Sequence, residues 1–169
     1  MTGKTTDSKE TLNLLDNLFH RRDGERERMR KSMKVVHGND LAPEINKMGI
    51  YRWYLHPALD TRAIRTILFW SQEIPPGSHS GKQKHQGGRV HYVWEGKGYT
   101  VVDGVKHEWE QGDLIMIPVK PDGVVFQHFN TDEDNPAVLL ASEPNWYDAL
   151  GVDMGSGFEQ LENAPECKE

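Results

Sequence analysis

A chain of 169 residues is long enough for one domain with an ordinary core. Its composition, 36% apolar and 27% charged, is typical of globular proteins, and its apolar runs are too short to cross a bilayer. The net charge of −6 argues against a nucleic-acid partner, because phosphate binding needs a basic face. The N-terminus lacks the apolar segment of a secretory signal, and the single cysteine, Cys167, cannot form a disulfide within the chain. We therefore expect a cytoplasmic protein that binds neither a membrane nor nucleic acid.

Residues 1–60 are predicted to form a helical arm and a lead-in to the main domain. Asp7 and Glu10 have the spacing of a helix N-cap pair, and apolar residues then recur at helical spacing, at Leu12, Leu15 and Phe19. We expect one or two helices within residues 8–34, with a break near Gly24 and a solvated face of mixed charges. Such an arm has too few apolar residues for its own core and must pack on the domain or on a second subunit. We predict a homodimer, formed through the arm or through an edge of the main domain.

Residues 61–155 are predicted to form an all-β domain. Short segments rich in β-forming residues alternate with Gly, Asp and Pro, as in VHYVW, YTVVD, DLIMIPV and AVLLAS. The turns EGKG and VDGV between them are typical of hairpins. Several short strands without an internal repeat favour a sandwich or a small barrel that closes its own edges. Residues 156–169 are predicted to be a flexible tail.

Two groups of residues within this domain resemble the two motifs of the cupin superfamily. The first motif runs glycine, His-x-His, glutamate and glycine. The residues at these positions here are Gly77, Gln83, His85, Arg89 and Gly96. Two usual ligands are therefore replaced, the first histidine by Gln83 and the glutamate by Arg89. The second motif is matched by Gly112, Asp113, Pro118 and His128. This resemblance implies a cupin-type antiparallel β-barrel (a double-stranded β-helix, or jelly roll) that holds a metal.

The flanking sequence is most similar to the gentisate dioxygenase branch of these proteins. The similarity lies in PPG before the first motif, VWEGKGYTVVDG after it, and GDLIMIP followed by HFN. Enzymes of that branch cleave aromatic rings with Fe(II) and O2, which implies a divalent transition metal, Fe(II) first, with Mn, Ni, Cu or Zn as alternatives. Their last metal ligand lies four residues before an asparagine, where this chain has Phe126 and Asn130. His128 matches a histidine that usually supports a ligand in that branch.

Strand alternation nevertheless offers a shifted set of metal ligands. Alternate residues of a strand share one face, and the register of the resemblance turns that face inward. The predicted metal ligands are the histidines on these inward faces, His85, His91 and His128. Neutral imidazoles suit transition metals, and three of them leave coordination positions free for water, O2 or substrate. Gln83, through its amide oxygen, and His79, from a loop at the barrel mouth, are alternatives for completing the set.

Arg89 and Gln83 are the predicted substrate-contacting or catalytic residues. An inward guanidinium cannot be discharged, so Arg89 needs an anion, which is either a protein carboxylate or the carboxylate or phosphate of a ligand. A ligand anion implies a small anionic organic substrate, a hydroxylated aromatic or related organic acid. Phe126, Tyr99 and Trp109 are candidates for lining an apolar pocket beside it.

Three functions remain open on the sequence. The first expectation is a metal-dependent dioxygenase that acts on such an acid. The second is a metal-dependent lyase, isomerase or hydrolase, in which the ion acts only as a Lewis acid. The third is a non-catalytic small-molecule-binding cupin, because a degenerate ligand set is what a loss of catalysis would leave. Fold analogy alone cannot choose among the three.

Overall fold

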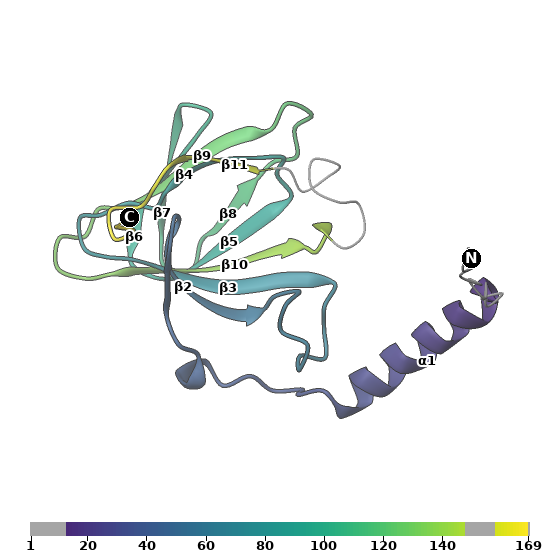
Figure 1. Ribbon diagram of the computed structural model, residues 1–169. Helices are drawn as coiled ribbons and strands as arrows, with labels where there is room; N and C mark the ends of the chain where they lie inside the picture. The colour runs from purple at the N-terminus through teal and green to yellow at the C-terminus, as the bar shows by residue number, and fades with distance from the viewer. Residues whose placement is uncertain (1–12, 148–157, 169) are drawn as a thin grey trace, which may run out of the picture.

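The structure, a computed structural model, describes residues 13–147 and 158–168. Figure 1 shows β-sheets that enclose a common interior and one helix, α1, that stands away from them. Within the described residues, every pair of neighbouring strands runs antiparallel. The predicted all-β jelly roll with an N-terminal helix is confirmed. No described helix is both long and apolar enough to span a membrane.

The larger sheet has the strand order β1-β2-β3-β10-β5-β8. Its strands are β1 (Glu44–Asn46), β2 (Gly49–Leu55), β3 (Ile67–Ile74), β5 (Arg89–Glu95), β8 (Leu114–Ile117) and β10 (Ala137–Pro144). The second sheet has the order β11-β4-β9-β6-β7. Its strands are β4 (Lys82–His85), β6 (Lys97–Val102), β7 (Val105–Glu110), β9 (Val124–Asn130) and β11 (Phe158–Glu162). A short 3₁₀ helix, Gly38–Asp40, precedes β1.

The sheets extend beyond residues 61–155 on both sides. Strands β1 and β2 lie in the region predicted as arm and lead-in, and β2 pairs with β3. Its aromatic residues explain the difference, since Tyr51 and Trp53 both pack against Trp70 of β3. Strand β11 lies in the region predicted as a flexible tail, where it pairs with β4 and covers what would otherwise be a sheet edge. The sheets of the barrel therefore include segments on both sides of residues 61–155.

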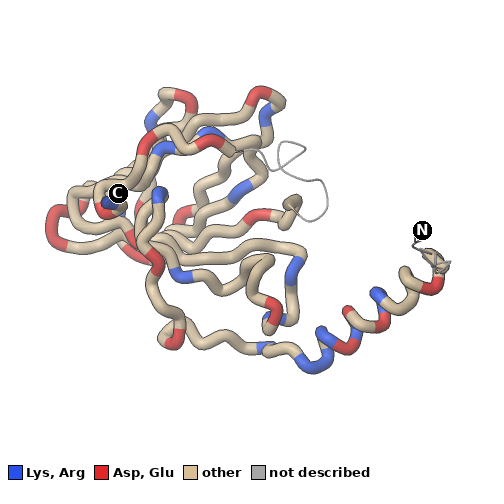
Figure 2. The backbone as a smooth tube through the Cα atoms, viewed as in Figure 1, with Lys and Arg blue, Asp and Glu red and all other residues tan. Residues whose placement is uncertain are grey.

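Helix α1 (Leu14–Lys31) is continuous, so the predicted break at Gly24 is wrong. The ion pair between Asp23 and Arg26 spans this position, and pairs from Glu25 and Glu27 to basic residues one turn later support the turns that follow, which helps to offset the low helix propensity of glycine. The described helix begins after Asn13, whose side chain accepts a hydrogen bond from Asp16 N. The predicted cap pair and Leu12 lie outside the described residues. Red and blue segments alternate along the helix in Figure 2, as expected for a solvated, mixed-charge face.

Two apolar surfaces of the described structure are exposed. Helix α1 has no buried residue and exposes its predicted apolar stripe, including Leu15 (60%). The outer face of β5 and β8 exposes two cross-strand apolar pairs, Val90 with Met116 and Tyr92 with Leu114. Strand β8 ends the described sheet. The homodimer through arm or edge stays a prediction, and these surfaces are the ones available for it.

The interior combines an apolar core with an unusual set of buried polar groups. One apolar cluster surrounds Trp70 and Phe126, and another surrounds Ile74 and Leu139. The polar and charged side chains buried beside them include Gln72, Gln83, His85, Arg89, His91, Thr100, His128 and Glu143. Buried polar groups cost free energy unless they are paired, so their partners define the candidate site.

Candidate functional site

The predicted site residues do face the barrel interior. Strand alternation turns Gln83 and His85 of β4 inward, together with alternate residues of β5 and β9. All five predicted residues are buried: Gln83, His85, Arg89, His91 and His128. A sixth buried residue that completes their surroundings, Glu143 of β10, was missed by the sequence reasoning. It ends the inward series of AVLLASEP, so the alternation of that strand was the signal that could have found it.

Arg89 is held on several sides by protein groups. Its Nε donates to Glu143 Oε2 at 2.8 Å, and its Nη1 donates to Gln83 Oε1 at 3.0 Å. The guanidinium carbon lies 5.1 Å from the ring centroid of Trp70 and 5.5 Å from that of Phe126. Of the two anions considered for Arg89, the structure supplies the protein carboxylate. The charge of the guanidinium is therefore matched within the barrel.

His85 belongs to the same network. Its Nδ1 accepts a hydrogen bond from Gly87 N at 2.9 Å, so the proton of the neutral ring is on Nε2. That Nε2 lies 3.2 Å from Glu143 Oε2, at ion-pair distance but without hydrogen-bond alignment. Burial by itself would raise the pKa of Glu143, but the charge of Arg89 and the contact with His85 outweigh it and lower that pKa to about 2. One nitrogen of His85 is thus hydrogen-bonded to the backbone, and the other faces the carboxylate of Glu143.

His91 and His128 form a separate buried pair. Their ring centroids are 4.5 Å apart, with the rings edge to face. His128 Nδ1 lies 2.7 Å from Thr100 Oγ1, which also accepts a hydrogen bond from Trp109 Nε1. His91 Nδ1 and His128 Nε2 have no hydrogen-bond partner. Burial, reinforced by the charge of Arg89, lowers the pKa of His91 and lowers that of His128 to about 3, so both rings are neutral at neutral pH.

These residues do not fit a three-histidine metal site as they are arranged. No group of three or more His, Cys, Asp or Glu side chains in the described parts of the chain is placed to hold a metal ion. The pair of His91 and His128 offers two unpartnered nitrogens, whereas His85 is turned toward Glu143 and Gly87. A protein metal site usually needs at least three protein ligands. The ligand set His85, His91 and His128 remains a prediction that would require side chains to rearrange.

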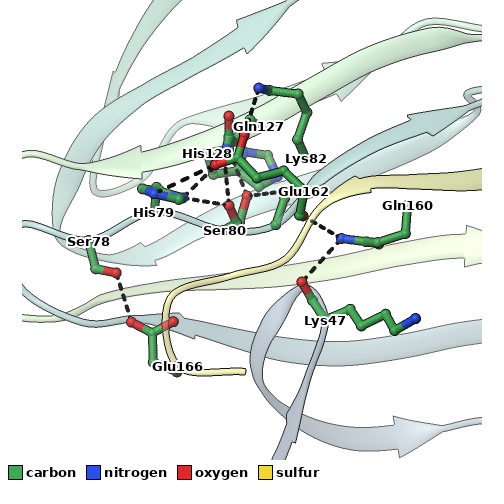
Figure 3. A network of polar contacts seen from close by, with 11 residues as sticks. Lys47, Ser78, His79, Ser80, Lys82, Gln127, His128, Gln160, Glu162 and Glu166 are labelled. Carbon is green, nitrogen blue, oxygen red and sulfur yellow. Dashed lines mark hydrogen bonds and ion pairs between the residues drawn. The ribbon is translucent and has the colours of Figure 1, made fainter. Parts of the chain in front are cut away.

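His79 lies outside this interior, in the polar network of Figure 3. Its side chain is half-buried, and its Nδ1 lies 2.9 Å from Ser80 O. Its Nε2 is 3.9 Å from a carboxylate oxygen of Glu162, the last residue of β11. The network reaches His128 only through the backbone, because His128 N donates to Ser80 Oγ. His79 is thus held by polar contacts outside the buried cluster, and its place at the barrel mouth stays a prediction.

A cavity of about 630 Å³ opens onto the Arg89 network. Its apolar lining comes from Met48, Tyr51, Trp53, Leu68 and Trp70, and its polar lining includes Gln83, Arg89, Glu143 and Tyr147. The expected lining by Phe126, Tyr99 and Trp109 is wrong for this cavity. Phe126 and Trp109 are core residues, and Tyr99 stacks on Phe129. The aromatic lining instead comes from Tyr51, Trp53 and Trp70 of β2 and β3, with Tyr147 and Phe158 beside them.

Comparison with known proteins agrees with this fold. The cupin domain family matches residues 70–143. The uncharacterized protein MJ1618 of Methanocaldococcus jannaschii is 31% identical over 93 residues, which cover 53% of this chain and 73% of that protein. The chain belongs to the cupin family. A solved structure, the polyketide cyclase RemF of Streptomyces resistomycificus, matches with a TM-score of 0.58 at 18% identity. The match covers 79% of this chain and 89% of the RemF chain. That likeness concerns the fold alone.

One relative of this cupin carries a named activity. The 5-aminosalicylate 1,2-dioxygenase of a Comamonas species is 26% identical over 96 residues, or 57% of this chain. The match covers 25% of the dioxygenase, so the chain spans about a quarter of that enzyme. This distant similarity agrees with the resemblance to ring-cleaving dioxygenases, while the placement in the gentisate branch stays a prediction.

Proposed function

We propose that this cupin binds a small hydroxylated aromatic molecule or a related organic acid in the cavity beside Arg89. The observation that carries the proposal is the composition of that cavity. Aromatic rings of Tyr51, Trp53 and Trp70 form its walls, and the buried pair of Arg89 and Glu143 lies on its polar side. Planar ligands gain from stacking on such walls, while a few fixed polar groups set their orientation.

The polar side of the cavity favours ligands that carry both hydrogen-bond donors and acceptors. Because Glu143 neutralises Arg89, the pair offers both hydrogen-bond donors and acceptors without a net charge. Burial raises the pKa of Tyr147 to about 12, so its hydroxyl stays protonated and can donate or accept. A ring with a hydroxyl next to a carboxyl or amino group presents the same mixture. The name of the Comamonas relative, a 5-aminosalicylate dioxygenase, supports this ligand class.

A metal-dependent ring-cleaving dioxygenase is the second candidate. It is favoured by that relative and by the unpartnered nitrogens of His91 and His128, which are groups suited to Fe(II). This candidate requires a third donor to move into place. Its predicted cofactor is Fe(II), with Mn, Ni, Cu or Zn as alternatives, and its predicted reaction consumes O2.

Two measurements on the purified protein test these candidates. Salicylate, 5-aminosalicylate, gentisate and unsubstituted benzoate are titrated by calorimetry, with cyclohexanecarboxylate as the non-aromatic control. We expect saturable binding of hydroxylated rings and none of the control; failure of every aromatic acid would refute the proposed function. Oxygen uptake with the same acids, after anaerobic loading with Fe(II), then separates binding alone from ring cleavage.

A further inference from the structure

We propose that the guanidinium of Arg89 takes the place of a metal ion at the centre of this barrel and keeps divalent cations out of it. The inference goes beyond the proposed ligand binding, because it holds whichever organic ligand the cavity binds, and it excludes the second, metal-dependent candidate. It concerns the mismatch between the metal expected from the sequence and the side chains that fill the interior.

The surroundings of Arg89 are those of a bound cation. A carboxylate oxygen of Glu143 and an amide oxygen of Gln83 accept its hydrogen bonds. The rings of Trp70 and Phe126 lie within cation–π range of the guanidinium carbon. The side chain is 6% exposed, and the rigid guanidinium is fixed by the hydrogen bonds of its Nε and Nη1. The positive charge is therefore part of the core and cannot swing out to make room.

The donors left for a metal are too few. Glu143, the buried carboxylate of the interior, is engaged by Arg89 and His85. His85 accepts from Gly87 through its other nitrogen. His91 Nδ1 and His128 Nε2 have no hydrogen-bond partner, and His85 Nε2 faces the same Glu143 oxygen that accepts from Arg89, so a metal ion bound by His85 and Glu143 would lie beside the guanidinium. A divalent cation is repelled about twice as strongly as a proton.

Removing the charge should therefore create a metal site. Arg89→Met keeps a long apolar side chain, removes the cation and releases the carboxylate of Glu143 beside His85. Arg89→Lys is the matched control, because it retains the positive charge. We expect Arg89→Met to bind Co(II) or Zn(II) at least about 100-fold more tightly than the wild type and Arg89→Lys do, from the Coulomb term alone.

The test is equilibrium dialysis of the wild type and both variants against Zn(II) and Co(II) at pH 7.5, with Co(II) absorption reporting on coordination. Circular dichroism checks that each protein is folded. The double variant Arg89→Met, Glu143→Leu should lose most of the gained affinity. If Arg89→Met is folded but binds Zn(II) and Co(II) no more tightly than the wild type does, the proposal is overturned. It is also overturned by a wild type that binds one Zn(II) per chain and loses it in His128→Ala, a result that stands even if Arg89→Met does not fold. Binding of aromatic acids by the wild type is measured separately, so the proposed function and the exclusion of metal by Arg89 can each fail without the other.

Discussion

The buried ion pair of Arg89 and Glu143 offers the most direct test of the interior. Glu143→Leu leaves the guanidinium buried with only Gln83 as an oxygen acceptor, and Arg89 cannot lose its proton. Arg89→Met leaves a buried carboxyl group, which can become neutral by taking up a proton. The two single variants therefore lose different amounts of unfolding free energy although they break the same contact. The double variant replaces both charges with apolar side chains of similar volume.

Breaking a buried pair from one side typically costs about 3–5 kcal/mol, whereas apolar replacement of both partners is often neutral. We expect Glu143→Leu to lose about 3–5 kcal/mol of unfolding free energy, Arg89→Met less, and the double variant less than Glu143→Leu alone. Urea denaturation of the four proteins, analysed as a double-mutant cycle, measures these values. Additive single effects, or a Glu143→Leu cost below about 1 kcal/mol, would show that the pair does not hold the interior as argued.

The same pair predicts how stability depends on pH. The pKa of Glu143 falls from 4.5 to about 2 on folding, so its contribution is present above pH 4.5 and is lost as the pH falls toward 2. The pKa of His128 falls from 6.5 to about 3, and because the unfolded ring binds a proton first, stability also declines below pH 6.5. We expect a plateau above about pH 7, a first decline below 6.5 and a steeper one below 4.5. Unfolding free energies measured from pH 3 to 8 would contradict this if they rose on acidification.

Three further predictions address the cavity, the buried hydrogen bonds and the oligomer. Trp53→Ala should weaken binding of hydroxylated aromatic acids at least about 10-fold in calorimetry, because an aromatic wall is lost, while exposed Trp94→Ala should leave it unchanged. Thr100→Val should lower the unfolding free energy by about 1–3 kcal/mol, because His128 and Trp109 lose the hydroxyl that both contact. Thr100→Ser keeps a hydroxyl and should retain most of the wild-type stability. Equal stability of the two variants in urea would refute the role of this hydroxyl. Sedimentation equilibrium should show a dimeric wild type. Either Leu18→Lys on the arm or Met116→Lys on the edge strand should convert this dimer to a monomer. A monomeric wild type would contradict the dimer prediction.

The local patterns of the sequence were sufficient for the fold class and for the inward faces. Alternation along KQKH, RVHYVWE and VVFQHFN correctly placed the predicted site residues inside the barrel, because each strand has only two faces and one of them is buried. Glycine, proline and the two motif resemblances located the turns and the family. The same local signals failed for helix α1, which continues through Gly24, where an ion pair between Asp23 and Arg26 spans the glycine.

Tertiary structure alone decided which buried groups meet. Arg89 could have paired with a ligand or with any carboxylate, and Glu143 became its partner because β10 lies between β3 and β5 in the sheet. That same arrangement turned His85 toward Glu143 and left His91 and His128 as a pair, where strand alternation had suggested one set of three ligands. Strand alternation fixes the face of a side chain but not its height along the barrel or its partner across the sheet. Those depend on strand order and register, which are long-range pairings that no local pattern specifies.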